Sequence, residues 1–254
     1  MPAYAAKGLI GILTPQANTT VEPEFAILAP PGVGLLTARL VSDKATMDDR
    51  LVDYLASLES TLARFANAPL GAAAFACTGA SYLIDPEEEA VRLAALEEER
   101  GYPVITAADA IAEALRQLDA DRVALLSPYG DALHGKALDY WRRRGLAPAQ
   151  VERLSAAEGA FHPIYALGAE AAENRLRALP AEGLDAVVIL GTGLPTLPTI
   201  LQQGAQPLPI LSPNLCLMWR ACLALAGEAP TPASLQPWLS GEAWGGRLEA
   251  RLAQ

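Results

Sequence analysis

The residue with the clearest chemical potential is Cys77, a thiol that follows a short apolar run and precedes Thr-Gly. A second segment repeats this pattern, because the apolar run 187–190 ends in Gly191-Thr192-Gly193. Short apolar runs closed by a turn signal are typical of buried parallel strands. Loops at the carboxyl ends of such strands are the usual ligand sites of open α/β sheets. The sequence therefore predicts a thiol at a ligand site, opposite a glycine on a matching loop.

A thiol in this position could act as a nucleophile or as an acid or base, since the backbone N–H groups of a strand-end loop lower a thiol pKa. The alternative is that Cys77 is a buried free cysteine that packs as a small hydrophobic residue. Its place at the end of the apolar run, before Thr78 and Gly79, favours catalysis. Cys216 and Cys222 lie in an apolar helical pattern and are predicted to be core residues.

Uncharged hydrogen-bond donors gather in three further loops after predicted strands. The backbone at Thr192 and Gly193 could form a cradle for a carboxylate or an oxyanion. Tyr129 offers a phenol after the matching strand of the second half, and packing at the edge of that half is an equally good interpretation. The segment 14–24 concentrates hydroxyl and amide groups that bind carboxylates. Taken alone, that segment is better explained as a turn that caps the next helix.

The internal repeat extends beyond these loops. Residues 11–15 match residues 124–128, and residues 102–106 match residues 208–212 in leading from an apolar run into a helical pattern. The matching segments occur in the same order at nearly equal spacing. This order predicts two similar lobes with the ligand between them.

Strand-like runs alternate with helical patterns along the chain, which predicts an α/β fold of parallel strands with right-handed helical crossovers. The predicted strands are 9–13, 34–40, 72–76, 104–105, 123–126, 186–190 and 210–211. Amphipathic spacing predicts helix over 47–65, and Asp85-Pro86 followed by three Glu predicts a helix start. We place the first lobe, with the Cys77 loop, at 1–118 plus 213–254. The second lobe, with the Gly191 loop, is placed at 119–212.

Composition narrows the class of protein. The chain has 254 residues, of which 52% are hydrophobic and 19% charged, and this indicates a globular fold. Its net charge of −10 argues against a nucleic-acid partner, because phosphate backbones require Lys and Arg. No leader-like segment opens the sequence, and no run reaches the roughly 20 apolar residues of a membrane span. We therefore expect a cytoplasmic protein with no membrane partner.

Metal chemistry is not expected. The two histidines, His134 and His162, lie far apart, and no motif has metal-ligand spacing. The three cysteines do not indicate a disulfide framework. Apolar helix faces could bury against the core or against a second copy, so the sequence leaves open whether the protein is a homo-oligomer.

Together these segments resemble the aspartate/glutamate racemase superfamily, and within it the branch of maleate cis-trans isomerases and arylmalonate decarboxylases. The most specific match is segment 15–24, Pro-Gln-Ala-Asn-Thr-Thr-Val-Glu-Pro-Glu, which is similar to an isomerase signature. Segments 77–81, 127–129 and 191–196 resemble the first cysteine loop, the tyrosine loop and the second cysteine loop. The resemblance implies two Rossmann-like α/β lobes related by a pseudo-twofold axis. It also implies one site between the lobes and no cofactor.

The resemblance also implies roles for particular residues. Cys77 would be catalytic. The substrate-binding residues would be Pro15, Asn18, Thr78, Gly79, Tyr129, Gly191, Thr192 and Gly193. We expect the apolar wall of the pocket to come from 40–47 and 161–165.

The chain departs from both groups that it resembles. Isomerases and racemases of this superfamily use two cysteines on opposite faces of the substrate, but the second position here is Gly191. Arylmalonate decarboxylases use one cysteine on the second loop and glycine on the first, which is the reverse of the arrangement here. The leading hypothesis is a cofactor-independent, maleate isomerase-like enzyme that acts on a small dicarboxylate, with Cys77 as nucleophile. The alternatives are an arylmalonate-decarboxylase-like lyase with Cys77 as proton donor and a catalytically reduced dicarboxylate-binding protein.

Overall fold

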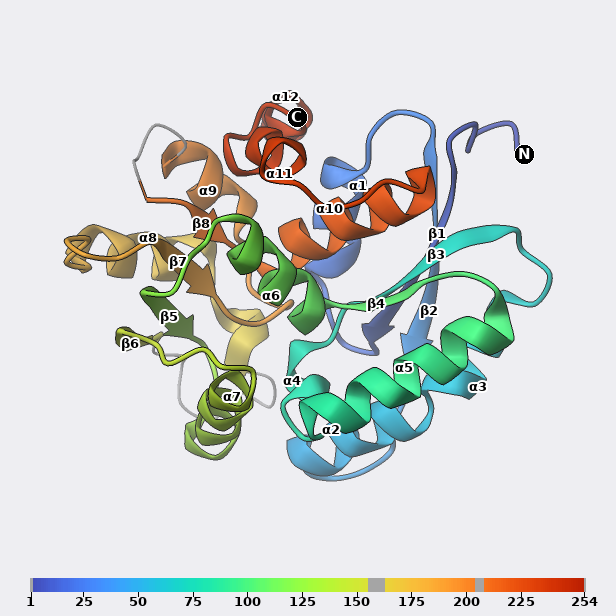
Figure 1. Cartoon of the computed structure of the whole chain (residues 1–254), viewed down its shortest axis with the longest axis horizontal. Helices are drawn as coiled ribbons and strands as arrows, with labels where there is room; N and C mark the ends of the chain where they lie inside the picture. The colour runs from blue at the N-terminus through green and yellow to red at the C-terminus, as the bar shows by residue number, and fades with distance from the viewer. Residues whose placement is uncertain (1, 155–162, 204–207, 254) are drawn as a thin grey trace.

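The computed structural model describes residues 2–154, 163–203 and 208–253, which form two four-stranded sheets flanked by helices (Figure 1). The first sheet has the order β2-β1-β3-β4, with β1 (Gly8–Pro15), β2 (Val33–Leu40), β3 (Leu70–Phe75) and β4 (Val104–Thr106). The second has the order β6-β5-β7-β8, with β5 (Val123–Ser127), β6 (Gln150–Arg153), β7 (Ala186–Ile189) and β8 (Ile210–Leu211). All neighbouring strands pair in parallel. The predicted α/β fold with two similar halves is confirmed.

Equivalent backbone hydrogen bonds fix the correspondence between the two halves. The N–H of Ala76, just after β3, donates to a β1 carbonyl at 2.8 Å. The N–H of Leu190, just after β7, donates to a β5 carbonyl at 2.9 Å. Cys77 and Gly191 follow directly, so they occupy the same position in the two halves.

Helices cover the sheets and join consecutive strands. In the first half they are α1 (Val21–Leu28), α2 (Met47–Ala56), α3 (Leu58–Leu62), the 3₁₀ helix η1 (Ala63–Phe65), α4 (Thr78–Ser81), α5 (Pro86–Arg100) and α6 (Ala107–Gln117). They are followed by α7 (Asp131–Arg143), the 3₁₀ helix η2 (Pro163–Ala166), α8 (Ala169–Ala178), α9 (Leu197–Gln203), α10 (Pro213–Ala226), α11 (Pro232–Leu239) and α12 (Gly245–Leu252). Among the described helices, none is both long and apolar enough to cross a bilayer.

Side-chain caps explain where several helices begin. The Asp85 carboxylate accepts the N–H of Glu87 at the start of α5, as the sequence predicts. Thr106 and Ser212 cap α6 and α10 in the same way, at matching positions after β4 and β8. The helical pattern over 47–65 folds as three consecutive pieces, α2, α3 and η1. The sequence did not predict β6, because this partly exposed edge strand is short and has no apolar run.

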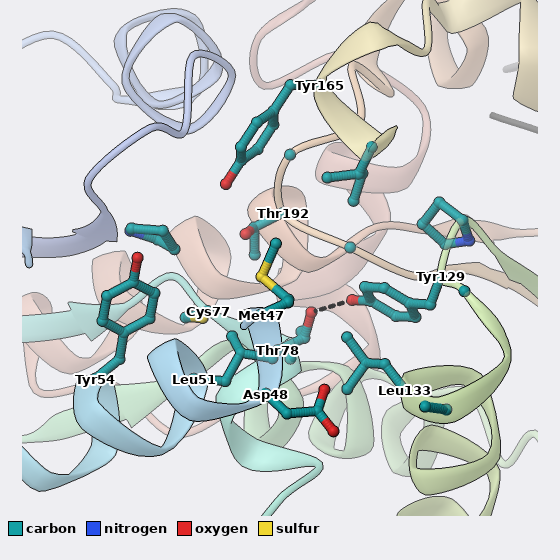
Figure 2. Close-up of a pocket in the computed structure, with 18 of the residues that line it drawn as sticks. Met47, Asp48, Leu51, Tyr54, Cys77, Thr78, Tyr129, Leu133, Tyr165 and Thr192 are labelled. Atoms are coloured by element: carbon teal, nitrogen blue, oxygen red, sulfur yellow. Dashed lines mark hydrogen bonds between the residues drawn. The ribbon is translucent and has the colours of Figure 1, made fainter. Parts of the chain in front are cut away.

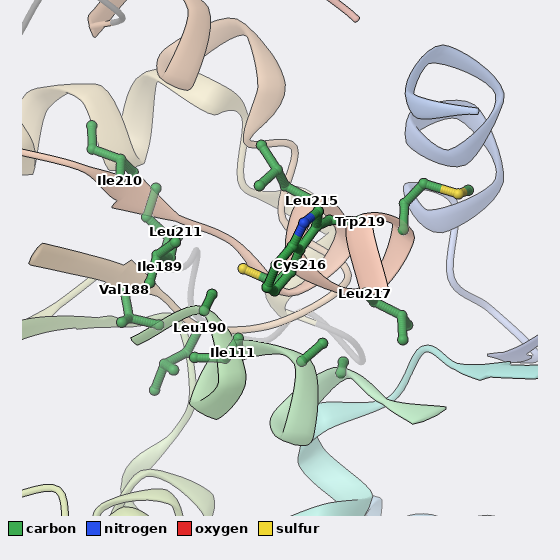
Figure 3. Close-up of a cluster of buried hydrophobic side chains, with 14 of the residues drawn as sticks. Ile111, Val188, Ile189, Leu190, Ile210, Leu211, Leu215, Cys216, Leu217 and Trp219 are labelled. Atoms are coloured by element: carbon green, nitrogen blue, oxygen red, sulfur yellow. The ribbon is translucent and has the colours of Figure 1, made fainter. Parts of the chain in front are cut away.

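The long helix α10 returns the chain to the first sheet, where it contacts β3, β1 and α6. Cys216 on this helix is fully buried beside Ile111 and Leu190 (Figure 3), and the predicted core role of Cys216 is confirmed. Cys222 is partly buried against the same core. The helix α12 contacts both α1 and α9, so it touches both halves. The lobe boundaries at 118/119 and 212/213 therefore stay a proposal.

Candidate active site

A cavity of about 420 Å³ opens between the two sheets, at the carboxyl ends of the central strands (Figure 2). Its walls come from the loops after β1, β3, β5 and β7, together with α2 and η2. Eight of the nine residues predicted for the site line it: Pro15, Cys77, Thr78, Gly79, Tyr129, Gly191, Thr192 and Gly193. The structure thus brings these loops together from distant parts of the sequence.

Cys77 lies at the start of α4 and is only 3% exposed. Burial raises the pKa of the Cys77 thiol to about 12, although the backbone N–H groups of Ala80 and Gly79 lower it. The N–H groups of the loop thus lower the thiol pKa, as the sequence predicts, but desolvation is the larger effect and the net shift is upward. Cys77 rests as a protonated thiol.

Tyr129 connects the two halves at one end of the cavity. Its hydroxyl lies 2.8 Å from Oγ1 of Thr78, and its ring packs edge-on against Tyr82 with centroids 5.8 Å apart. Burial raises the pKa of Tyr129 well above its ordinary value, so the phenol is neutral and able to donate. Because these two hydroxyl groups bond to each other, one of their two protons stays free to donate to a ligand beside Cys77.

Two further phenols, Tyr54 and Tyr165, lie at the other end of the cavity and were not among the predicted site residues. Tyr54 comes from α2 and Tyr165 from η2, and both hydroxyl groups point toward the cavity (Figure 2). Burial raises the pKa of both phenols, and the neighbouring Cys77 raises it further. On the amphipathic helix α2, Tyr54 has the spacing of an ordinary core aromatic. The sequence around Tyr54 therefore does not distinguish a core aromatic from a residue that lines the cavity.

Gly191 has a backbone conformation that suits glycine, with φ of +92°. A Cβ atom at this position would lie 2.5 Å from Cδ1 of Ile164 and 3.0 Å from Cγ of Pro128. It would also lie 3.4 Å from the hydroxyl oxygen of Tyr129. The place of a second thiol is therefore filled by other side chains, and the Gly191 loop contributes backbone to the cavity.

Asn18 is the predicted site residue that does not line the cavity. It is 2% exposed, and its Oδ1 accepts the N–H groups of Thr20 and Val21 at the start of α1. Its Nδ2 donates to Oγ1 of Thr192 at 3.3 Å. This geometry does not support the predicted contact with substrate. Asn18 stabilises the turn that leads into α1 and supports Thr192, which does line the cavity.

The cavity holds no formal positive charge, since none of its described lining residues is Lys, Arg or His. Two acids, Asp48 and Asp131, lie in its wall and form ion pairs with Lys136 at 2.8 Å and Arg153 at 3.0 Å. These pairs offset the repulsion that the two acids would exert on an anion. A carboxylate in the cavity would be held by hydroxyl and backbone N–H donors.

The apolar wall comes from Met47, Leu51, Leu133 and Ile164. Met47 lies in the predicted stretch 40–47, and Ile164 and Tyr165 lie in the predicted stretch 161–165, whose residues 161 and 162 fall outside the described residues. Within the described ranges, no group of three or more His, Cys, Asp or Glu side chains is placed to hold a metal ion.

Comparison with known proteins places these features in a family context. A family model described as arylmalonate decarboxylase matches residues 10–235. A maleate isomerase from Geobacillus stearothermophilus is 27% identical over an alignment of 253 residues, which covers 92% of this chain and 97% of the relative.

Solved structures share the fold. The maleate isomerase Iso from Pseudomonas putida S16 superposes with a TM-score of 0.78 at 23% identity, covering 92% of this chain and 98% of that one. A mutant of the Nocardia farcinica maleate cis-trans isomerase superposes with a TM-score of 0.74 at 24% identity, covering 86% and 93% of the two chains. That structure contains a covalently bound succinylcysteine intermediate.

Proposed function

The chain belongs to the arylmalonate decarboxylase family, as its resemblance to that branch of the aspartate/glutamate racemase superfamily predicts, and from this premise we propose that it is a cofactor-independent isomerase of a small dicarboxylate. The observation that carries the proposal is the buried thiol of Cys77 at the carboxyl end of β3, among phenol, hydroxyl and backbone N–H donors. The maleate isomerase relatives support the same substrate class.

In this mechanism the Cys77 thiol first loses its proton to solvent, and the resulting thiolate adds to one alkene carbon of a maleate-like substrate. The former double bond becomes a single bond, about which one carboxylate rotates, and departure of the thiolate then gives the trans isomer. Thr78, Tyr129 and the Thr192–Gly193 backbone hold one carboxylate and stabilise the enediolate-like intermediate. Tyr54 and Tyr165 are placed to receive the other. The succinylcysteine in the Nocardia farcinica structure is the adduct that such an addition gives once the α-carbon has also gained a proton.

A second candidate is decarboxylation of a substituted malonate, and one observation favours it. The raised pKa keeps the Cys77 thiol protonated at neutral pH, which is the state that a proton donor requires. The same hydroxyl and N–H donors would stabilise the enediolate that remains after CO₂ leaves. Cys77 would then deliver its proton to the carbon from one face.

The test is incubation with maleate and, separately, with phenylmalonate, followed by NMR. We expect fumarate from maleate. Cys77→Ser should abolish turnover while circular dichroism shows an intact fold, because a hydroxyl is a far weaker nucleophile than a thiolate. Cys222→Ser, which alters a half-buried cysteine outside the cavity, is the matched control and should retain activity.

Near-normal fumarate production by Cys77→Ser would end the isomerase proposal. Release of CO₂ from phenylmalonate without fumarate from maleate would replace it with the decarboxylase. A rise in melting temperature with dicarboxylates, without any product, would instead indicate a binding protein.

A further inference from the structure

Three polar side chains of segment 18–24 (Asn18, Thr20 and Glu24) cross from the first half to the Gly191 loop, although the mechanism above makes no use of them. Asn18 donates to Oγ1 of Thr192 at 3.3 Å, and Oγ1 of Thr20 donates to the carbonyl of Gly193 at 2.8 Å. Glu24, on α1, reaches the same loop further along. This segment, the most specific match in the sequence, is thus a clamp on the Gly191 loop.

Glu24 is the charged member of this clamp and is 5% exposed. Its Oε1 accepts the backbone N–H groups of Thr196 at 2.6 Å and Leu197 at 3.2 Å, and the Thr196 hydroxyl at 3.3 Å. Its Oε2 accepts Nδ2 of Asn214 at 2.7 Å. Burial raises the pKa of Glu24, and these four hydrogen bonds lower it. Burying a carboxylate costs folding free energy unless the group is well hydrogen-bonded. Packing alone therefore does not explain why a charged residue occupies this position.

Asn214 transmits the position of Glu24 to the cavity wall. The same Nδ2 that donates to Glu24 also donates to the backbone carbonyl of Thr192, at 3.1 Å. Both amide hydrogens are therefore used, one by the Glu24 carboxylate and the other by the carbonyl oxygen of Thr192. A flipped amide would turn Oδ1 toward two acceptors, so the Glu24 carboxylate fixes the orientation of Asn214.

The carbonyl that Asn214 holds belongs to the peptide between Thr192 and Gly193. In a planar trans peptide the N–H points opposite to the C=O. Asn214 lies outside the cavity, whereas Thr192 and Gly193 line it. Holding the Thr192 carbonyl away from the cavity therefore turns the N–H of Gly193 toward it.

We propose that Glu24 is a positioning residue that, through Asn214 and the Thr192 carbonyl, aims the N–H of Gly193 at a carboxylate of the substrate. The inference rests on the proposed function only in requiring that the substrate carries a carboxylate. It assigns the clamp a role in substrate binding without contact between Glu24 and substrate.

The test follows the backbone amide resonances of Gly193 by NMR during titration with malonate, an unreactive dicarboxylate. In the wild type we expect the Gly193 amide to shift as malonate binds. Glu24→Gln keeps the side-chain size but places an amide beside Nδ2 of Asn214, so the shift should be lost. With maleate, kcat/KM of this variant should fall by about tenfold to a hundredfold, because a donor to the substrate carboxylate is no longer aimed at it. The matched control is Glu22→Gln, on the same helix, where the carboxylate is half-buried, pairs with Arg39 and makes no hydrogen bond with the described residues of the Gly191 loop.

A second variant covers the case in which Glu24→Gln does not fold. Asn214→Ala removes the donor to the Thr192 carbonyl while Glu24 keeps its bonds to Thr196 and Leu197. We expect the same loss of the Gly193 shift. If malonate shifts the Gly193 amide resonance as much in either folded variant as in the wild type, the proposal is overturned.

The two proposals fail in different ways. A wild-type protein whose Gly193 amide responds to malonate but which makes no fumarate overturns the isomerase and leaves the role of Glu24 standing. A wild-type protein that makes fumarate while its Gly193 amide ignores malonate overturns the role of Glu24 alone.

Discussion

The loops that begin at Cys77 and at Gly191 occupy the same place in two similar halves, yet they contribute different chemistry. After Cys77 the chain enters α4 at once, which turns the N–H groups of Gly79 and Ala80 toward the thiol. After Gly191 no helix begins until Leu197. That stretch is held from outside by Asn18, Thr20, Glu24 and Asn214. One loop therefore presents a reactive side chain, and the other presents positioned backbone.

The difference teaches that a shared backbone does not imply a shared role. A second thiol at position 191 would meet Ile164 and Pro128 on a backbone with positive φ. The missing cysteine is thus part of a loop whose packing excludes a side chain there.

The largest expected effect is the pH dependence of the reaction at Cys77. Burial raises the pKa of this thiol from 9.0 to about 12, so the thiolate is a minor species whose fraction grows about tenfold per pH unit below that value. Isomerisation that begins with the thiolate should therefore speed up as pH rises, and the rise should continue above about pH 9, where an unshifted thiol would level off. The measurement is kcat/KM for fumarate formation between about pH 7 and pH 10.

Decarboxylation would behave differently over this range. A proton donor that is already protonated gives a rate that is flat with pH. An isomerisation rate that levels off near neutral pH would contradict the raised thiol pKa. Such a result would show that substrate binding changes the surroundings of Cys77 and lowers the pKa of its thiol.

Much of the site could be predicted from sequence because the repeat places its loops. Cys77, Thr78 and Tyr129 each follow an apolar strand, and the parallel topology brings strand ends to one edge. The sign of the pKa shift could not be predicted, because it is the balance of burial against two N–H groups. The place of Asn18 outside the cavity lining could not be predicted either, because it depends on local hydrogen bonds from the N–H groups of Thr20 and Val21.

A smaller effect is expected when a thiol is introduced at position 191. Gly191→Cys should destabilise the fold by about 2–4 kcal/mol, from backbone strain at positive φ and from contact with Ile164. Adding Ile164→Ala removes the closest contact at 2.5 Å and should recover part of this loss. Urea unfolding of the single and double variants measures both effects, with Ile164→Ala alone as the control.

The double variant also tests what an opposed thiol does. With a substrate that yields a chiral α-carbon, two thiols deliver protons from both faces, so product enantiopurity should fall relative to the wild type. A folded, active double variant that keeps strict one-face delivery would show that position 191 is not opposed to Cys77 across the substrate. A Gly191→Cys variant as stable as the wild type would contradict the argument from packing.

The smallest expected effect compares the glycines two positions further along, Gly79 and Gly193. A Cβ on Gly79 would lie 3.2 Å from Leu51 and would sit in helix α4, where alanine is favoured over glycine. A Cβ on Gly193 would lie 2.4 Å from the ring of Tyr165. Gly79→Ala should therefore change the free energy of unfolding by less than about 1 kcal/mol, whereas Gly193→Ala should cost about 1–3 kcal/mol. If urea unfolding shows that both variants lose the same free energy of unfolding, the two loops are packed alike. The proposed contrast between the helical Cys77 loop and the externally held Gly191 loop would then be wrong.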